Sequence, residues 1–211
     1  MPSGATTGGG EPPATLRSEH AEATRRAVLA AARSLFGRNG YAQTSVDEIA
    51  ATARVTKGAV YHHFAGKEAL FRTVFMQAEA EAEARADEAA DPAAAPVDQI
   101  VARVNAYLDA ALDTELRRIV LVDGPAVLGP EGEGSVDQQP GHVGLRSFIA
   151  ASAARGQVTG LDPDLLAYLV RGLAWLGGLR IAYASDPAAT RAALGQAIDV
   201  MLRGLAPGQS R

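Results

Sequence analysis

Apolar residues recur every three to four positions along most of the chain, which is the spacing of one face of an α-helix. In the first such stretch, which opens at Ser18, the residues Val28, Ala32 and Leu35 lie at i, i+4 and i+7. Two glycines and an asparagine follow within residues 37–40, and residues of these types commonly end helices. The pattern therefore predicts a helix from Ser18 that stops in this segment.

Two short helices are predicted next. Ser45 and Glu48 form the S-x-x-E pattern of a capping box, so a helix of about two turns is expected to begin after Ser45. A short break separates it from a second helix over residues 57–64, which places Val60 and Phe64 on one face. The pair therefore has the form of two short helices joined by a tight turn.

The rest of the chain is predicted to form longer helices. One opens at Lys67 and runs through an alanine- and glutamate-rich stretch to Pro92. Residues 114–129 contain an apolar run that would suit a strand, but the run lacks the alternation of a strand, so a helix is expected. Residues 129–141 are polar and glycine-rich and are predicted to be a loop. The fold class is all-α, with further helices expected over residues 97–112, 141–156, 162–184 and 187–205.

Composition narrows the class of protein. The chain has 211 residues, of which 47% are hydrophobic, and no cysteine. It can therefore bury a core, and it has no disulfide. No run approaches the 18 apolar residues of a transmembrane helix, so no membrane is expected among its partners. Residues 1–16 lack the apolar segment of a secretory signal and are predicted to be a flexible tail, so a cytoplasmic protein is expected.

Charge is distributed unevenly along the chain. The formal net charge is −4, which by itself argues against a nucleic-acid partner. Residues 17–72, however, hold nine basic and five acidic residues, a net charge of +4 that leaves −8 for the remainder. A basic first third on an acidic remainder is compatible with contact between that third and nucleic acid.

Residues 54–70 concentrate the unusual side chains of this protein. They hold both lysines, Lys57 and Lys67, and two of the four histidines, His62 and His63. Adjacent residues project about 100° apart on a helix, so the two histidines cannot easily share a metal ion. The sequence also lacks the motifs of serine hydrolases, zinc proteases and phosphate-binding loops. No metal, no cofactor and no catalytic residue is therefore predicted.

The same residues suit a helix-turn-helix motif, whose second helix lies in the DNA major groove. Lys57 can donate to guanine, and Gly58 lets the start of the helix approach DNA closely. Tyr61 and His62 can reach phosphate or a thymine methyl group. The free backbone N–H groups at the start of the next helix, together with Lys67, favour a phosphate.

Residues 24–75 resemble the N-terminal domain of tetracycline-repressor (TetR) family regulators. The matching motifs are F-x-x-x-G-Y, T-[ST]-V-x-x-I-A, V-[ST]-K-G-x-[VL]-Y-x-[HY]-F and K-E-x-L. The resemblance implies three helices for DNA binding over residues 17–65, then about six helices over residues 66–211 that bind a ligand and dimerise. It also implies that the last two helices form a four-helix bundle across a homodimer.

The resemblance further implies which residues meet DNA. Arg54 stands just before the turn, where the family often has glycine, and its effect is left open. Carried over onto matching positions, the DNA contacts of the family fall on Thr44, Ser45, Thr56, Lys57, Gly58, Tyr61, His62, His63 and Lys67.

The later helices carry two further expectations. Apolar and aromatic side chains on the central helices are expected to line a pocket for an apolar or amphipathic effector: Phe75, Tyr107, Leu108, Leu121, Val122, Phe148 and Trp175. The last two helices carry more apolar surface than a monomer exposes, and the dimer interface is expected at Leu166, Val170, Leu173, Leu194, Ile198, Met201 and Leu202.

The predicted function is a ligand-responsive repressor that binds a palindromic operator as a homodimer. A regulator of the same kind without a small-molecule effector is an alternative, and an apolar cavity in the second domain would separate the two. A third hypothesis, an enzyme, finds no pairing of a nucleophile with a base in the later helices.

Overall fold

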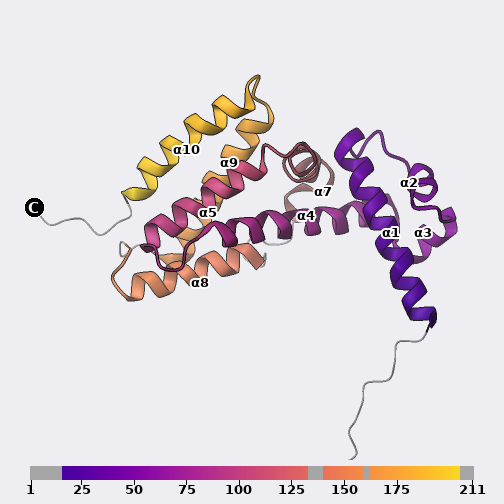
Figure 1. Ribbon diagram of the computed structural model, residues 1–211, viewed down its shortest axis with the longest axis horizontal. Helices are drawn as coiled ribbons and strands as arrows, with labels where there is room; N and C mark the ends of the chain where they lie inside the picture. The colour runs from indigo at the N-terminus through magenta and orange to yellow at the C-terminus, as the bar shows by residue number, and fades with distance from the viewer. Residues whose placement is uncertain (1–15, 133–139, 159–161, 205–211) are drawn as a thin grey trace, which may run out of the picture.

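A computed structural model describes residues 16–132, 140–158 and 162–204, and within these ranges the chain contains helices and no strand (Figure 1). The all-α prediction is therefore confirmed. The tail predicted before residue 16 and the middle of the loop predicted at 129–141 lie outside the described residues. The helices are α1 (Leu16–Asn39), α2 (Val46–Ala53), α3 (Lys57–His63), α4 (Lys67–Ala89), α5 (Pro96–Ala110), α6 (Thr114–Leu116), the π-helix η1 (Arg117–Asp123), α7 (Gly124–Gly132), α8 (Pro140–Ala154), α9 (Pro163–Ala182) and α10 (Pro187–Arg203).

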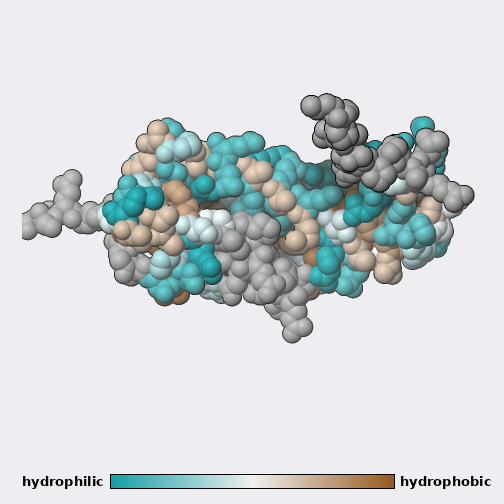
Figure 2. Space-filling view, turned by 90° about the horizontal axis from the view of Figure 1, so that it is seen from below, coloured by the Kyte–Doolittle hydropathy of each residue, from teal (hydrophilic) through white to brown (hydrophobic). Residues whose placement is uncertain are grey.

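The described part of the molecule is elongated. Helices α1, α2 and α3 gather at one end, and α4 runs from them to the other end, where α5 and α8 pack on it and α9 and α10 pack on α5 (Figure 1). Helices α6, η1 and α7 follow one another without interruption, so they form a single bent segment beside α1 and α4. Seen from the side of α8, most of the surface is hydrophilic and the hydrophobic residues form small separate patches (Figure 2).

The first three helices pack on an aromatic core. The Phe36 and Phe71 rings meet edge to face, with centroids 5.1 Å apart, and Tyr41 contacts both. Val60 and Phe64 are buried as predicted. Because Phe71 belongs to α4, this core joins the long helix rigidly to the three helices before it.

Local sequence signals set most helix ends. The capping box of Ser45 and Glu48 is present, and Asp162 caps α9 through the N–H groups of residues 164 and 165. Gly40, with φ at 81°, ends α1. Gly37 lies inside α1 instead of ending it. Its lack of a side chain makes room for Glu115, because a Cβ there would lie 2.3 Å from Glu115 Cγ.

The π-helix was not predicted. Residues 114–129 are helical as expected, but η1 adopts the wider turn, in which the N–H of Gly124 bonds to the carbonyl of Ile119. Gly124 lies against the ring of Phe75, and a Cβ would come within 2.5 Å of that ring. Helical periodicity does not distinguish this turn from an α-helical one, since the apolar residues stay on one side in both.

Helix α9 is apolar on nearly all sides. Within the described residues it is the one helix that is long and apolar enough to cross a membrane by length and composition, and 39% of its most apolar window is buried. Its covered side packs against α5, α8, α10 and η1. Its other side leaves large apolar residues exposed, namely Leu165, Tyr168, Leu169 and Leu176, with Tyr183 just beyond its end.

The predicted dimer residues need correction for this reason. Leu166, Val170, Ile198 and Leu202 are buried within the chain itself and cannot meet a second copy. Leu173 and Leu194 are partly buried, whereas Met201 is exposed. The apolar stripe chosen from the sequence is thus mostly the inner one. When a helix is apolar on nearly all sides, the spacing of its apolar residues does not show which side faces outward.

Candidate nucleic-acid interface

Helix α3 is fixed at both ends and along one side. The Thr56 hydroxyl accepts a hydrogen bond from the N–H of Ala59, at 3.1 Å, which caps the start of the helix. The N–H of Phe64 donates to the Val60 carbonyl and closes its last turn. Since Val60 and Phe64 are buried, the remaining faces of this two-turn helix point outward.

The outward faces carry most of the predicted DNA contacts. Tyr61 has half of its surface exposed, and Lys57, Gly58 and His62 are also exposed. A Cβ built on Gly58 would have one neighbour within 4 Å, the Thr56 hydroxyl at 3.8 Å. The start of α3 is therefore accessible to a molecule as large as a DNA backbone.

The histidines differ in their surroundings. His63 is partly buried, whereas its neighbour His62 is exposed, and their ring centroids lie 5.3 Å apart at 74°. Within the described ranges, no group of three or more potential ligands could hold a metal ion. The pair therefore presents one free imidazole, on His62, and one that packs beside Phe64.

Lys57 is held by a residue that sequence reasoning missed. Its Nζ lies 2.8 Å from Oδ2 of Asp47, on α2, and both side chains are exposed. This hydrogen bond and the charge of Asp47 raise the pKa of Lys57. The ion pair crosses from α2 to α3 and orients the ammonium group before any partner arrives.

Two predicted contacts change their role. Thr44 is 1% exposed, and its hydroxyl donates to the Gly40 carbonyl at 2.8 Å. Its side chain is thus part of the turn between α1 and α2 and is withdrawn from the predicted DNA surface. Ser45 is exposed at the start of α2, where its hydroxyl bonds with Glu48.

Lys67 opens α4, after Gly66, and its Nζ lies 4.1 Å from the centroid of the Tyr41 ring. This cation–π contact holds the ammonium group beside the helix start. The first N–H groups of α4 and the lysine charge together make a site suited to a phosphate.

Arg54 resolves a point that the sequence left open. It occupies the left-handed region, with φ at 58° and ψ at 40°, and its N–H caps the end of α2. A glycine at this place is free of the side-chain strain that arginine bears. Arg54 therefore preserves the turn between α2 and α3, and its exposed side chain adds a positive charge there.

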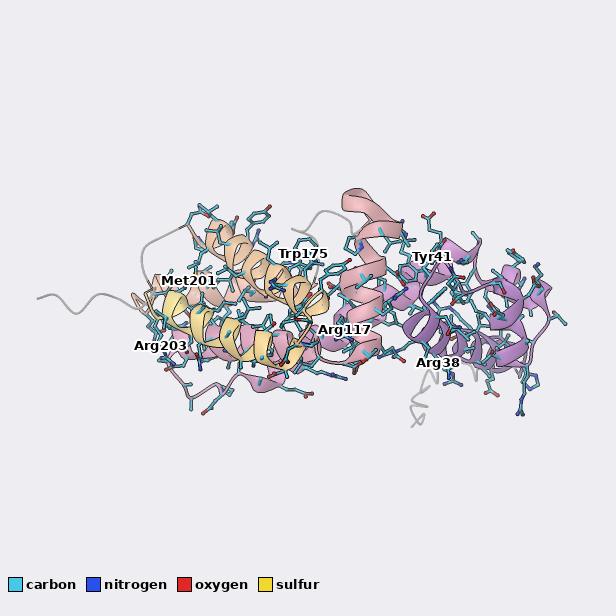
Figure 3. The ribbon with its side chains drawn as sticks, turned by 90° about the horizontal axis from the view of Figure 1, so that it is seen from above. Arg38, Tyr41, Arg117, Trp175, Met201 and Arg203 are labelled. Carbon is cyan, nitrogen blue, oxygen red and sulfur yellow. The ribbon has the colours of Figure 1, made fainter. Side chains whose placement is uncertain are left out.

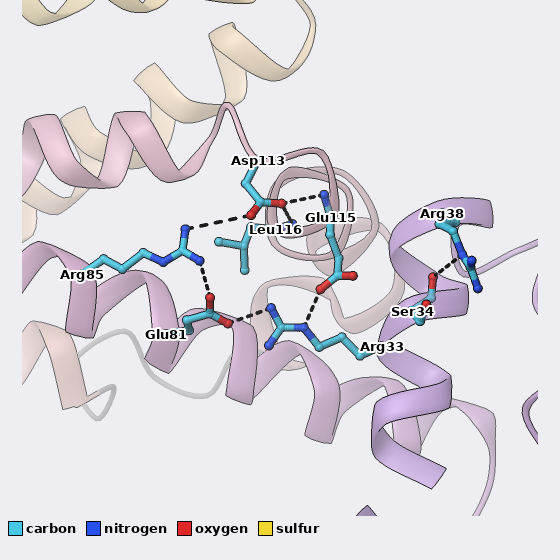
Figure 4. Close-up of polar contacts among 8 residues, drawn as sticks. All are labelled: Arg33, Ser34, Arg38, Glu81, Arg85, Asp113, Glu115 and Leu116. Carbon is cyan, nitrogen blue, oxygen red and sulfur yellow. Dashed lines mark hydrogen bonds and ion pairs between the residues drawn. The ribbon is translucent and has the colours of Figure 1, made fainter. Parts of the chain in front are cut away.

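A network of ion pairs joins α1 to the later helices (Figure 4). Arg33, on α1, pairs with Glu81 of α4 at 2.7 Å and with Glu115 of α6 at 2.5 Å. Arg85 pairs with Glu81 and lies 3.9 Å from Asp113. Burial raises the pKa of Glu81, but the contacts with the two arginines outweigh burial and lower it overall. The network thus links three helices through charged groups.

A second connection lies just beyond the end of α1. The N–H of Tyr41 donates to Asp123, at the end of η1, and Arg118 holds the same carboxylate at 3.2 Å. A Cβ at Gly40 would lie 2.1 Å from the Arg118 guanidinium, so the glycine permits this approach. Figure 3 shows Tyr41 on the side of the first three helices that faces this segment.

A cavity of about 50 Å³ opens between α4, α5, α8 and α9, far from α3. Tyr107 and Trp175, both predicted pocket residues, line it, and Tyr107 also borders a smaller void that Leu121 lines. Phe75 and Leu108 are instead fully buried core. Two further predicted residues, Val122 and Phe148, are partly buried and line neither space.

Three charged residues line this cavity and were not predicted: Glu83, Arg103 and Arg171. Arg171 pairs with Glu83 at 2.9 Å and with Glu79 at 3.3 Å. Burial raises the pKa of Glu83 above its usual value, and the charge of Arg171 offsets this in part. The available signal was Arg171 itself, an arginine in the middle of an apolar helix.

Comparison with known proteins assigns a family to each of two regions of the chain. Residues 28–74 match the family described as "Bacterial regulatory proteins, tetR family", and residues 97–205 match "Tetracyclin repressor-like, C-terminal domain". A TetR-family transcriptional regulator from Pectobacterium atrosepticum is 35% identical, with a TM-score of 0.78, over 90% of this chain and 97% of that one.

Curated relatives match over shorter stretches of the chain. The Tn10 TetC protein of Escherichia coli is 41% identical over 61 residues, 29% of this chain and 31% of that protein. The transcriptional repressor BepR of Brucella suis is 42% identical over 65 residues, 30% of this chain and 31% of that protein. The matches thus span about three tenths of these relatives. Since the C-terminal family alone covers half of the chain and the Pectobacterium regulator nearly all of it, this protein belongs to the TetR family of transcriptional regulators, which are not enzymes.

Proposed function

We propose that this regulator binds a palindromic operator in the cytoplasm as a homodimer, through a DNA-binding domain over residues 17–65. One observation supports the proposal: α3 buries one of its sides and exposes Lys57, Tyr61 and His62 together on the others. Two copies of such a helix, related by a two-fold axis, would read half-sites about one helical turn apart. Repression follows the printed name of BepR, a transcriptional repressor that is 42% identical over 65 residues.

Dimerisation is proposed through the outer faces of α9 and α10. The outer face of α9 exposes Leu169 and Leu176, with Tyr183 just beyond its end. The outer face of α10 exposes Val200 and Met201. Met201, on α10, is labelled in Figure 3. An exposed apolar area of this kind on neighbouring helices suits a self-complementary interface.

Ligand response is proposed for the second domain, residues 66–211. The cavity borders α4, which continues into the three DNA-binding helices, so a change at the cavity can move them. Pockets for drug-sized ligands have volumes of roughly 300–1,000 Å³, so a cavity of about 50 Å³ must widen to hold one. This small size also favours the second candidate, a regulator without an effector.

Selection of a bound sequence from random DNA, followed by titration of Lys57→Ala and Lys67→Ala, tests the DNA proposal. Lys57→Ala should lose roughly 1–3 kcal/mol on the selected site and relax base preference. Lys67→Ala should weaken all sequences alike and reduce the salt slope by about one unit. Arg146→Ala, at an exposed position of α8, serves as the control. Unchanged affinity and salt slope in both lysine variants would refute the interface.

A further inference from the structure

The wall of the cavity is apolar except for one charged side. Val104, Leu145 and Trp175 belong to the apolar part. The charged part consists of two guanidinium groups, on Arg103 and Arg171, and one carboxylate, on Glu83. A ligand in this space therefore meets a mostly apolar wall and, beside it, two guanidinium groups that are both engaged in ion pairs.

Arg171 ties α9 to α4. It lies between Glu79 and Glu83, which are one turn apart on α4, and the side chains of all three residues are mostly buried. Two carboxylates here share one guanidinium in a poorly solvated place, which makes the second carboxylate costly to keep charged. Glu83, the one on the cavity wall, is thus the partner most readily exchanged.

Arg103 has an unused donor. Its Nη1 pairs with Asp87, an exposed residue of α4, and its guanidinium lies 5.4 Å from the centroid of the Phe148 ring. Its Nε is buried and has no hydrogen-bond partner. Among the residues that the structure describes, no other buried side-chain nitrogen or oxygen lacks a partner. A buried donor without an acceptor is unfavourable, so this group calls for an acceptor.

We infer that the cavity takes an amphipathic acid, whose carboxylate binds Arg103 and Arg171 and whose apolar body lies against Trp175, Tyr107 and Leu145. This inference rests on the proposed effector role of the cavity. The incoming carboxylate supplies the acceptor that Arg103 lacks and replaces Glu83 at Arg171. A cationic ligand would stand beside two guanidinium groups and would leave the Arg103 donor unpaired.

The replacement also explains how binding reaches DNA. Both glutamates that Arg171 holds belong to α4, and α4 carries the three DNA-binding helices at its other end. When an acid takes Arg171, α4 loses one tie to α9 and gains freedom to shift. By linkage, operator DNA then weakens acid binding by the factor with which the acid weakens DNA binding.

The test compares octanoate, 1-octanol and octylamine, which share a chain length and differ in the head group. Trp175 is the single tryptophan, and its fluorescence at pH 7 reports binding in the cavity. Octanoate should bind about tenfold more tightly than octanol or better, which is the effect of one or two charge-assisted hydrogen bonds. Octylamine should bind more weakly than both. Equal binding of all three, a preference for the amine, or no binding of octanoate would overturn the inference.

Variants assign the preference to the two arginines. Arg103→Gln should abolish the advantage of octanoate over octanol, and so should the charge-balanced double variant Arg171→Gln with Glu83→Gln. Arg155→Gln, at an exposed site after α8, should keep that advantage. Thermal unfolding of each variant verifies the fold, and the double variant decides the matter should Arg103→Gln fail to fold. Retention of the preference in the folded variants would overturn the assignment.

Operator titrations separate this inference from the proposed function. Specific DNA binding without any compound tests the proposed function alone, and its absence would contradict that function while the fluorescence data still decide the ligand class. With DNA binding established, octanoate should lower operator affinity about fivefold or more, and octanol should not. Release by octanol as readily as by octanoate would refute the acid and leave ligand response standing.

Discussion

The N–H of Tyr41 donates a 2.8 Å hydrogen bond to Oδ2 of Asp123, a residue 82 positions later in the chain. The ring of the same tyrosine lies under the Lys67 ammonium group, at the start of α4. Tyr41 therefore contacts both the end of η1 and a proposed phosphate-binding lysine. A shift of η1 would move the turn between α1 and α2 and, through it, the surface proposed to meet DNA.

The ion pairs of Arg33 and Arg85 with Glu81 should make stability depend on pH. The pKa of Glu81 is lower in the folded protein than its ordinary value of 4.5. Its stabilising contribution is therefore present above pH 4.5 and is lost as the pH falls through the lower folded pKa. Glu81→Gln should reduce the free energy of unfolding by about 1 kcal/mol at pH 7, a modest value because the pairs are partly exposed, and by less near pH 3.

Urea unfolding at several pH values, followed through Trp175 fluorescence, measures this difference. Glu88→Gln, two turns further along the same helix and exposed, should change the free energy of unfolding by less than about 0.5 kcal/mol at pH 7. A Glu81→Gln difference that grows as the pH falls would contradict the stabilising role of the network.

Gly40→Ala should destabilise the protein by about 1–3 kcal/mol. Its φ of 81° strains any residue with a Cβ, and that Cβ would overlap the Arg118 guanidinium. Gly144→Ala is the matched comparison, since Gly144 is helical with nothing within 4 Å of its Cβ position. It should stabilise the protein by up to about 1 kcal/mol. Equal thermal shifts for the two variants would show that the approach at Gly40 is not tight.

Arg54→Gly should separate stability from DNA binding. Glycine relieves left-handed strain of about 1–2 kcal/mol but costs about 0.5–1 kcal/mol in chain entropy, so the free energy of unfolding should rise by about 0.5 kcal/mol. Loss of one exposed positive charge should at the same time weaken operator binding and reduce its salt dependence. A variant that is less stable than the parent would contradict the strain assigned to Arg54.

Leu176→Glu should convert a dimer to a monomer without unfolding the chain. Leu176 is 57% exposed on α9, so a glutamate there meets water in the monomer and an apolar surface in the proposed dimer. Met76→Glu, on α4 and 44% exposed, should leave the dimer intact. Sedimentation at micromolar concentration distinguishes the two. A parent protein that sediments as a monomer would rule out this interface.

The sequence predicted the helices well because their ends depend on local chemistry. Ser45, Asp162 and Gly40 each act within a few residues of their own position, and such signals are visible in the chain. The π-turn of η1 ends at Gly124, which lies against the ring of Phe75, and these two residues are far apart in sequence. Contacts of that kind leave no periodic trace.

The candidate sites show the same division. Exposed residues of α3 could be predicted because burial of Val60 and Phe64 fixes its orientation. Thr44 was placed incorrectly, since its burial depends on the carbonyl of Gly40. The charges of the cavity were missed because Glu83 and Arg171, 88 positions apart, form a site only when α4 and α9 meet.

Gly37 and Gly40 restrict which DNA-binding helices could replace those of this protein. At both positions α1 touches the later helices through bare backbone, against Glu115 in one case and Arg118 in the other. A chimera whose grafted DNA-binding helices lack glycine at 37 or 40 would bring a side chain into the corresponding gap. Both halves of such a hybrid should fold, but its DNA-binding helices should lie at an altered angle to α4, whereas a graft that keeps glycine at 37 and 40 should avoid this change. Engineering of such hybrids therefore has to keep two glycines that lie outside both α3 and the cavity.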